Sequence, residues 1–338
     1  MERLSYELLT RMSLRRPTTE LVLRRRAWAL PLFMTTAAAR LLVGCLKGEV
    51  AFVHLSDGVL APLALIARMF RVPVGVTLHG LDVVYDALAY RAWRKAFLRG
   101  FDVYVCISEA TRAAACDVGL PSRRLRVIGI GVNAAIPSHG PMRETDCLLF
   151  VGRLVRRKGL AWFVRHVLPS LARARPQLRL VVLGDGPERE AIISSARDVG
   201  VADRLVWPAS RDDATKELWL CRATLCIMPN VPVHGDMEGF GIVALEAAAA
   251  ACVVVAADLE GLREAVAEGR AGTLVPAADA LAWIRTLSEL LDDAARRDQA
   301  GENARRYVLQ HFQWDAVVDA YECAFTQAIL ARHLRLVR

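Results

Sequence analysis

One stretch, residues 229–257, constrains the fold more than any other, because a glycine turn, an apolar helix and an apolar strand follow one another within it. A Gly-Phe-Gly turn at residues 239–241 leads into the run I-V-A-L-E-A-A-A-A-A, which predicts a buried helix from Ile242. Residues 252–257, C-V-V-V-A-A, are apolar throughout, as in a parallel strand that is covered on both faces. The stretch therefore predicts an α/β fold with a parallel sheet.

Two carboxylates flank the glycine turn at the start of this helix. Glu238 lies on the predicted loop, and Glu246 lies about one turn inside the predicted helix. The glycines leave backbone N–H groups accessible at a helix start, where an anion can bind. An acid within an apolar helix is costly to bury unless a partner hydrogen-bonds it, and sugar hydroxyls would do so. The alternative is that Glu238 is a solvated loop charge and Glu246 a helix-surface charge.

This stretch resembles the E-x7-E signature of the retaining GT-B glycosyltransferases of glycosyltransferase family 4. The resemblance implies two Rossmann-like domains that face each other across a cleft, the second of which holds most of a nucleotide-sugar donor. In that family the glycines and the first glutamate line the diphosphate and the sugar, and the second glutamate binds the ribose. Glu238 and Glu246 would take these roles here. The family usually has a glycine and a proline between this helix and strand, whereas residues 250–253 are A-A-C-V.

Three further motifs resemble the family at the ends of predicted strands. The loop G-R-L-V-R-R-K-G, after the strand that begins at Cys147, would clamp the donor pyrophosphate, unless it is only a solvated basic loop. The turn L-G-D-G-P at residues 183–187 would line the nucleotide cleft; as a dinucleotide fingerprint it is weak, because Arg189 stands at the third glycine position. The strand ending T-L-H-G at residues 77–80 would supply the family's active-site histidine, although a lone histidine is more often structural.

The resemblance thus implies a set of site residues. The catalytic residues would be Glu238 and His79. The donor-binding residues would be Arg153, Lys158, Gly184, Gly186, Gly239, Phe240, Gly241 and Glu246. Asp57 and Asp82, which follow two predicted strands of the first domain, are assigned to the acceptor side. No metal ligand and no cofactor are expected, because the seven histidines and eight cysteines contain no H-E-x-x-H, no C-x-x-C and no Cys/His cluster.

The length of 338 residues, with 54% hydrophobic content, allows two domains of ordinary size. We expect an N-terminal acceptor-side Rossmann-like domain at residues 1–137, a linker rich in proline and glycine at 138–146, and a nucleotide-sugar-binding domain at 147–309. Residues 310–338 are expected to form a helical segment that crosses back to the first domain.

The N-terminal region departs from the family. Residues 1–12 have helical periodicity, and residues 21–23 are expected to form a strand. Related enzymes begin with a strand and a glycine turn, and their first helix is similar to M-E-R-L-S-Y-E-L. We therefore expect the sequence as given to lack the first strand of the first sheet. Residues 27–39 are apolar, but they are fewer than the roughly 20 residues that a membrane span needs, so a core or amphipathic helix is expected.

The charge distribution indicates an anionic partner. Formal net charge is +8, and residues 1–100 alone hold 15 Lys or Arg against 7 Asp or Glu, a difference of +8. Such a balance suits a phospholipid surface or nucleic acid, and charge alone does not separate them. Residues 90–101 interleave basic side chains with Trp93 and Phe97, which fits a lipid-surface contact or, equally well, a solvated helix. The cysteines lie in apolar runs, as in a reduced cytoplasmic protein.

Together these features predict a metal-independent, retaining hexosyltransferase. It would move a sugar from a UDP- or GDP-sugar to a glycan or lipid-linked acceptor in cell-envelope or exopolysaccharide synthesis. We expect it in the cytoplasm, with an anionic membrane surface as a further partner and no nucleic acid. One alternative is a retaining glycosidase, which would need Glu238 and Glu246 about 5 Å apart at one bond and would leave Arg153 and Lys158 without a role. The other is a catalytically weak transferase-fold module that binds a membrane or another anionic partner.

Overall fold

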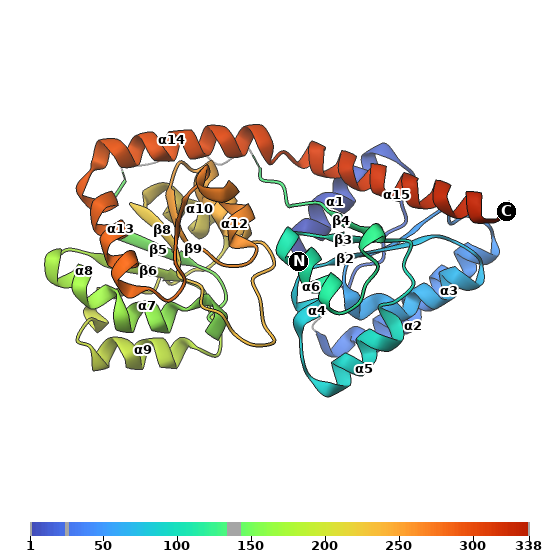
Figure 1. Cartoon of the computed structure of the whole chain (residues 1–338), viewed down its shortest axis with the longest axis horizontal. Coiled ribbons are helices and arrows are strands. Elements are labelled where there is room, and N and C mark those ends of the chain that lie inside the picture. Colours follow the sequence, from blue (N-terminus) through green and yellow to red (C-terminus); the bar gives the residue numbers. More distant parts are fainter. Residues whose placement is uncertain (1, 24–26, 134–142, 337–338) are drawn as a thin grey trace. The chain divides into compact units, whose positions relative to one another are not determined.

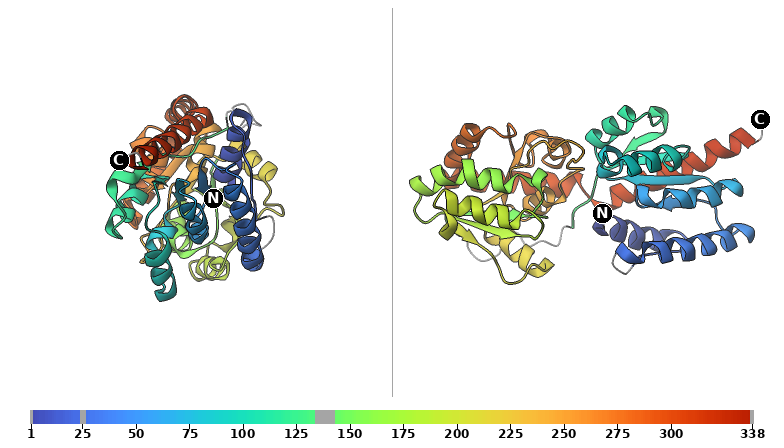
Figure 2. Two further views of the ribbon diagram at one scale, coloured as in Figure 1. Left: turned by 90° about the vertical axis from the view of Figure 1, so that its right-hand side faces the viewer. Right: turned by 90° about the horizontal axis from the view of Figure 1, so that it is seen from below.

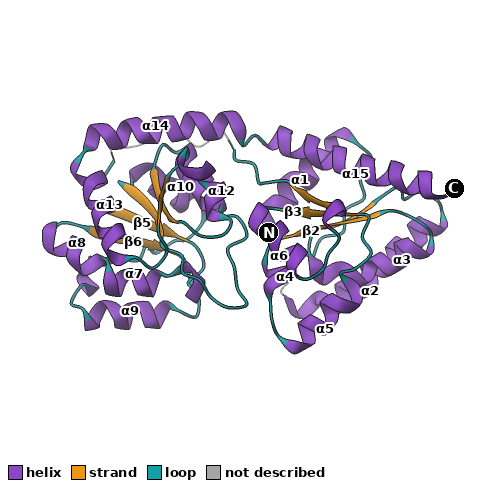
Figure 3. Cartoon of the chain, in the orientation of Figure 1, coloured by secondary structure: helices purple, strands orange, loops and turns teal. Residues whose placement is uncertain are grey.

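The computed structural model describes residues 2–23, 27–133 and 143–336. The chain divides into two compact units, Met1–Gly131 with Trp314–Arg338, and Val132–Gln313 (Figure 1). Each unit contains one parallel sheet covered by helices (Figure 3). Two α/β units with parallel sheets confirm the predicted fold class. Of the predicted linker, residues 138–142 lie outside the described residues.

The sheet of the first unit has the strand order β1-β2-β3-β4, and every pair is parallel. Its strands are β1 (Val53–Leu55), β2 (Val74–Leu78), β3 (Val103–Cys106) and β4 (Leu125–Val127). β2 and β3 are buried along their whole length, because V-G-V-T-L and V-Y-V-C direct mostly apolar side chains toward both faces. The carboxyl ends of β1 and β2 deliver Asp57 and His79 to loops at the same edge of the sheet.

Helices cover both faces of this sheet. They are α1 (Glu2–Arg15), η1 (Ala27–Ala29), α2 (Leu30–Leu46), η2 (Gly58–Leu63), α3 (Ala64–Met69), α4 (Leu81–Val84), α5 (Leu88–Phe97), α6 (Glu109–Asp117), η3 (Ser122–Arg124) and α15 (Trp314–Leu336), where η marks a 3₁₀-helix. The strand predicted at residues 21–23 is wrong, because the described residues before Val53 contain helices and coil only. Val22 is 52% exposed, so this segment lacks the packing that stabilises a strand.

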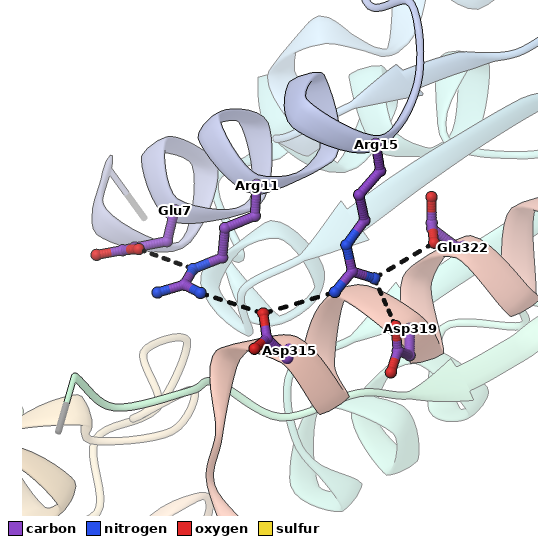
Figure 4. A network of polar contacts seen from close by, with 6 residues as sticks. All are labelled: Glu7, Arg11, Arg15, Asp315, Asp319 and Glu322. Carbon is purple, nitrogen blue, oxygen red and sulfur yellow. Dashed lines mark hydrogen bonds and ion pairs between the residues drawn. The ribbon is translucent and has the colours of Figure 1, made fainter.

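The C-terminal helix α15 belongs to the first unit and packs against α1. Leu4 and Leu8 of α1 are buried, each being 3% exposed. Arginines of α1 face acids of α15 beside it (Figure 4), with Arg11 3.2 Å from Asp315, Arg15 2.5 Å from Asp319 and Arg15 3.4 Å from Glu322. Solvent screens such pairs, so they align the two helices more than they stabilise them.

The sheet of the second unit has six parallel strands in the order β10-β9-β8-β5-β6-β7. They are β5 (Cys147–Val151), β6 (Arg179–Leu183), β7 (Leu205–Val206), β8 (Leu225–Met228), β9 (Val253–Ala257) and β10 (Thr273–Val275). The chain builds outward from β5 in one direction and from β8 in the other, and β5 and β8 are neighbours. Loops diverge at the carboxyl ends of strands at such a switch point, which is where open α/β sheets bind ligands.

Helices also cover this second sheet. They are η4 (Arg156–Lys158), α7 (Leu160–His166), α8 (Leu168–Ala174), α9 (Arg189–Asp198), η5 (Ala202–Arg204), α10 (Asp213–Arg222), α11 (Ile242–Ala249), α12 (Leu262–Ala265), η6 (Ala267–Gly269), α13 (Ala280–Asp292) and α14 (Ala294–His311). α11 is the predicted alanine-rich helix, and it packs against β8, β9 and α14.

The turn between α11 and β9 adopts a left-handed backbone without a glycine. Ala251 has a φ of 55°, a conformation that alanine enters only at an energetic cost. The turn is nonetheless well connected, because Arg143 donates a hydrogen bond to the Ala250 carbonyl at 2.6 Å. A side chain at Gly301 of α14 would collide with the carbonyl oxygen of Ala251, so the backbones of the two segments are in direct contact.

Candidate functional site

The loops that follow β5 and β8 are joined at the switch point of the second sheet. Gly159 has a φ of 66°, and a Cβ atom on it would lie 1.9 Å from the carbonyl oxygen of Pro229. The N–H of Val231 donates to the carbonyl of Arg157 at 2.9 Å. Glycine is therefore required at position 159 for the two loops to meet, and their meeting places Lys158 next to the segment after β8.

The loops that follow β5 and β6 also cross closely. A Cβ atom on Gly184 would lie 1.9 Å from the carbonyl oxygen of Gly152, and one on Gly186 would lie 2.4 Å from that of Leu154. The N–H of Leu154 donates to the carbonyl of Asp185 at 2.9 Å. Gly184 and Gly186, predicted as donor-binding residues, thus have a structural role in this crossing. Their contact with a ligand stays a prediction.

Glu238 is the centre of a buried polar cluster. Its carboxylate forms an ion pair with Lys158, and each side chain is only 10% exposed. Asn230 Nδ2 donates to Glu238 Oε2 at 3.0 Å, and Arg157 Nε lies 3.8 Å from the same oxygen. Burial alone would raise the pKa of Glu238, but Lys158, Arg157 and Asn230 outweigh burial and hold the pKa below its usual value. Glu238 is therefore an ionised, acceptor-only group at neutral pH.

Four members of this cluster were not predicted from the sequence. Arg157 pairs with Asp236 at 3.2 Å, and Glu260 accepts the backbone N–H of Glu238 at 2.5 Å. Asn230 is 1% exposed, and among the described residues its Oδ1 has no hydrogen-bond partner. Only Arg157 could have been suspected from the sequence, because it belongs to the basic loop. Asn230 and Asp236 follow β8 and Glu260 follows β9, and these residues come close to Glu238 only when the loops fold.

Glu246 lies in a second ion pair. It is 2% exposed within α11, and Lys216 of α10 places its Nζ 3.1 Å from Glu246 Oε1. Lys216 also lies 3.0 Å from Asp213. The alternative that Glu238 and Glu246 are ordinary surface charges is wrong, since both are buried and paired. Lys216 was not predicted, because nothing in its helix distinguishes it from other lysines.

The glycine turn fixes the start of α11. Gly241 is the residue before the helix and has a φ of 87°, and a Cβ atom on it would lie 2.5 Å from a Leu262 methyl. Phe240 is 3% exposed and packs edge-on against Phe312 with ring centroids 6.5 Å apart. The turn is thus closely packed, with Gly239 between Phe240 and the paired Glu238.

Arg153 differs from the rest of the predicted site. Its side chain is exposed on the loop after β5, and its guanidinium forms no ion pair with any residue that the structure describes. The structure therefore brings Lys158 and Glu238 together, gives Glu246 a partner of its own and leaves Arg153 available to a ligand.

His79, Asp57 and Asp82 form a cluster within the first unit. His79 Nε2 lies 2.8 Å from the carbonyl of Ser56, and the N–H of His79 donates to Asp82 Oδ2 at 2.6 Å. Burial lowers the pKa of His79 to about 4, so the ring is neutral at pH 7. Because a carbonyl only accepts, Nε2 carries the hydrogen and Nδ1 is left as an acceptor.

The two aspartates of this cluster lie in different environments. Asp57 caps the start of η2, where its Oδ1 accepts the N–H of Val59 at 2.8 Å. Asp82 is 7% exposed and packs against Gly58. Burial, together with the charge of Asp57, raises the pKa of Asp82 to about 7. The His79–Ser56 hydrogen bond thus joins the loops after β1 and β2, and Asp82 beside it gains or loses its proton near neutral pH.

Comparison with known proteins assigns both units. Residues 6–135 match the family model described as Glycosyltransferase Family 4, and residues 145–293 match the one described as Glycosyl transferases group 1. The GDP-mannose-dependent alpha-(1-6)-phosphatidylinositol monomannoside mannosyltransferase of Mycolicibacterium smegmatis is 31% identical over 277 residues, which cover 76% of this chain and 72% of the relative. The chain belongs to glycosyltransferase family 4.

Solved structures support the fold of this glycosyltransferase. Sucrose-phosphate synthase from Thermosynechococcus elongatus superposes with a TM-score of 0.74 at 22% identity, covering 93% of this chain and 82% of the other. The Anabaena protein HepE, solved in complex with UDP-glucose, gives a TM-score of 0.72 at 17% identity, covering 93% and 87%. The predicted GT-B architecture with two Rossmann-like domains is therefore confirmed.

The predicted residues of the glycosyltransferase fall within the matched segments. The first segment contains Asp57, His79 and Asp82, and the second contains Lys158 and the glutamates of the E-x7-E motif. The family assignment thus covers both clusters described above, whereas the role of each residue remains a prediction.

Proposed function

We propose that this glycosyltransferase transfers a hexose, with retention of configuration, from a UDP- or GDP-sugar to a glycan or lipid-linked acceptor. One observation carries the proposal: a buried ion pair between Lys158 and Glu238 lies at the carboxyl ends of β5 and β8, where the strand order reverses. A buried cation and a buried, ionised carboxylate side by side suit a ligand that carries both a diphosphate and a hydroxyl-rich sugar.

Lys158 and Arg153 are proposed to bind the diphosphate. Lys158 is held in place by Glu238. Arg153 is exposed and forms no ion pair with the residues that the structure describes, so its guanidinium can approach phosphate oxygens in a bidentate manner. Positive charge at these oxygens stabilises the negative charge that develops when the nucleoside diphosphate departs. These two cations supply the neutralisation, so we propose a reaction that needs no metal and no cofactor.

Glu238 and Glu246 are proposed to bind sugar hydroxyls. Ionised Glu238 accepts hydrogen bonds from the reacting sugar and stabilises positive charge at its anomeric carbon. Glu246, held by Lys216, accepts from the ribose hydroxyls. His79 offers a neutral Nδ1 as an acceptor for a further hydroxyl. Asp57 and Asp82 are proposed to lie on the acceptor side.

The glycosidase alternative is disfavoured by the pairing of the two glutamates. It would use Glu238 as nucleophile and Glu246 as acid, with both carboxyls at one bond. An ionised Glu238 would suit that nucleophile. Glu246, however, pairs with Lys216 and Glu238 with Lys158, so the two carboxylates belong to separate ion pairs.

The acceptor and the location are proposed by analogy. The mycobacterial relative is named for a phosphatidylinositol monomannoside substrate and for GDP-mannose, and HepE was solved with UDP-glucose. We propose a lipid-linked or envelope glycan acceptor, met at the cytoplasmic face of the membrane. The catalytically weak module is kept as the second candidate, because Arg153 and Lys158 could hold a nucleotide without turnover.

The test is calorimetric titration of the protein with UDP, GDP and their sugars, followed by NMR assignment of the anomeric product. Arg153→Ala and Lys158→Ala should each weaken nucleotide binding by about 1.5 to 3 kcal/mol, the contribution of a charged hydrogen bond. Arg173→Ala, an exposed arginine on α8, is the control and should bind as the parent does. Unchanged affinity in both site variants would refute the diphosphate assignment, and binding without transfer would favour the weak module.

A further inference from the structure

Helix α2 exposes an apolar face although its other face already lies in the core. Its inner side chains pack into the core cluster of the first unit: Phe33, Met34, Ala37, Leu41 and Cys45. On the outer side Leu32 is 62% exposed, Val43 50% and Leu46 66%. Arg40 is the one charged residue of the helix. Thr35 and Thr36 are also exposed on this side. Three large aliphatic side chains exposed beside one another indicate a face that meets a partner.

The exposed apolar surface continues from α2 onto its neighbours. Leu32, Val43 and Leu46 are spaced by 11 and 3 residues, which places them on one side of α2. α3 packs against α2, and its Leu65 and Met69 are 48% and 76% exposed at successive turns. Figure 2 shows α2 and α3 side by side in the first unit. We call the exposed apolar side chains of these two helices the α2–α3 face: Leu32, Leu42, Val43, Leu46, Leu65 and Met69.

Basic side chains border the α2–α3 face. Arg40 and Lys47 lie seven residues apart along one edge of α2, and among the described residues neither forms an ion pair. α2 and α5 both contact η2. Exposed basic side chains recur on α5 and just after it at every fourth residue: Arg91, Lys95 and Arg99.

The basic side chains on and just after α5 also form a concave surface. Together with the end of α6 they line a hollow of about 540 Å³. The exposed acids nearby are Glu49, Asp86 and Asp117; Asp117 itself lines the hollow, and Asp86 lies 3.7 Å from Arg91. The basic residues of this side therefore outnumber the acids, and the hollow can take a phosphate-bearing head group.

We propose that the α2–α3 face docks this protein on an anionic phospholipid leaflet, with α2 lying in the plane of the interface. An apolar strip with a cationic border complements a surface whose interior is apolar and whose head groups are negative. A second copy of the chain would place the same cationic borders against each other, which opposes a symmetric dimer through this face. Among the described residues no helix is both long and apolar enough to cross a bilayer.

The docking surface extends the proposed function, because a lipid-linked acceptor would be met at the same leaflet. It does not depend on the transferase chemistry, since none of its residues belongs to the clusters around Glu238 or His79. Vesicle binding and sugar transfer to a water-soluble acceptor therefore test the two proposals separately.

The experiment is flotation of the full chain with phosphatidylcholine vesicles that do or do not contain phosphatidylglycerol. We expect binding to the anionic vesicles only. The double substitution Val43→Glu and Leu46→Glu should weaken that binding at least about tenfold, because each side chain loses its transfer to the lipid interface. Leu281→Glu is the matched control, since Leu281 is 80% exposed on α13 of the other unit. Unchanged nucleotide binding and melting temperature confirm that the double variant is folded.

Three outcomes would overturn the proposal. The first is equal flotation of the double variant and the Leu281→Glu control. The second is equal binding of the parent to both kinds of vesicle, because the cationic border would then have no effect. The third is that the parent binds no vesicles but forms a concentration-dependent dimer, and that the double variant does not form this dimer. That result would assign the α2–α3 face to a second copy of the chain.

Discussion

Lys158 and Glu238 form an ion pair in which each side chain is only 10% exposed, and the two residues come from loops after different strands. Because both charges have lost most of their water, each depends on the other, and Glu238 is compensated further by Asn230 and Arg157. A diphosphate that approaches Lys158 would compete with Glu238 for the same ammonium. The pair thus holds the cation in position before a ligand arrives.

Breaking this pair should destabilise the protein. Lys158→Met leaves Glu238 buried without its main partner and should lower the free energy of unfolding by about 3 to 5 kcal/mol. The double variant Lys158→Met with Glu238→Gln should recover part of that loss, whereas Lys47→Met, at an exposed position, should change stability by no more than about 0.5 kcal/mol. Urea titrations at neutral pH measure all three.

The same titrations in acid test the charge state of Glu238. Its pKa is lower in the folded than in the unfolded protein, so its contribution to stability is present above its ordinary pKa and is lost as the pH falls through the folded value. Glu238→Gln should lack this acid-dependent loss. A parent protein and variant with parallel pH profiles would contradict the assignment.

The two glutamates should differ in kinetics. Glu246→Gln removes a carboxylate proposed to bind the ribose in ground state and transition state alike, so it should mainly raise the donor KM. Glu238→Gln removes charge next to the reacting sugar, so it should mainly lower kcat. Glu289→Gln, an exposed glutamate on α13, is the control. If both site variants keep the parent's kcat and KM, the proposed roles are wrong.

Asp82 should make the first unit less stable as the pH rises toward neutrality. Its pKa is raised to about 7 in the folded protein, above the ordinary value of 3.8, so its contribution is fully present below the ordinary pKa and is lost as the pH rises through about 7. Asp82→Asn keeps an oxygen that accepts the His79 N–H and cannot ionise.

We therefore expect Asp82→Asn to be more stable than the parent above neutral pH. Its stability should not decline between the ordinary pKa of 3.8 and the raised pKa of about 7. Asp82→Ala, which also loses the hydrogen bond, should be less stable than Asp82→Asn at every pH. Thermal unfolding across a pH series measures this. A decline of the same size in the Asn variant would show that another group causes it.

Ala251→Gly should stabilise the second unit. Ala251 has a φ of 55°, and glycine adopts this backbone without the steric cost that alanine carries, so a gain of about 0.5 to 1 kcal/mol is expected. Ala250→Gly is the matched control, because Ala250 has a φ of −85°, which alanine adopts without strain. Glycine at this position only adds conformational freedom to the unfolded chain, so it should destabilise the folded protein. Urea unfolding distinguishes them. A loss of stability in Ala251→Gly would mean that the turn is not strained.

The sequence by itself determined the local elements and the family. The apolar run at 253–257, the alanine-rich helix before it and the glutamate spacing each depend on neighbouring residues, so periodicity and motif sufficed to predict them. The same reasoning failed at residues 21–23, because an apolar triplet becomes a strand only where another strand or a core accepts it.

Only the tertiary structure decided which charges meet. Lys158 pairs with Glu238, Lys216 pairs with Glu246, and Asp82 accepts the backbone N–H of His79. None of these three pairings was predicted from the sequence. The first two contacts join segments far apart in the chain that the order of β5 and β8 and the packing of α10 against α11 bring together. Sequence spacing carries no information on such contacts, because strand order and helix packing are set by the burial of the whole core rather than by any one segment.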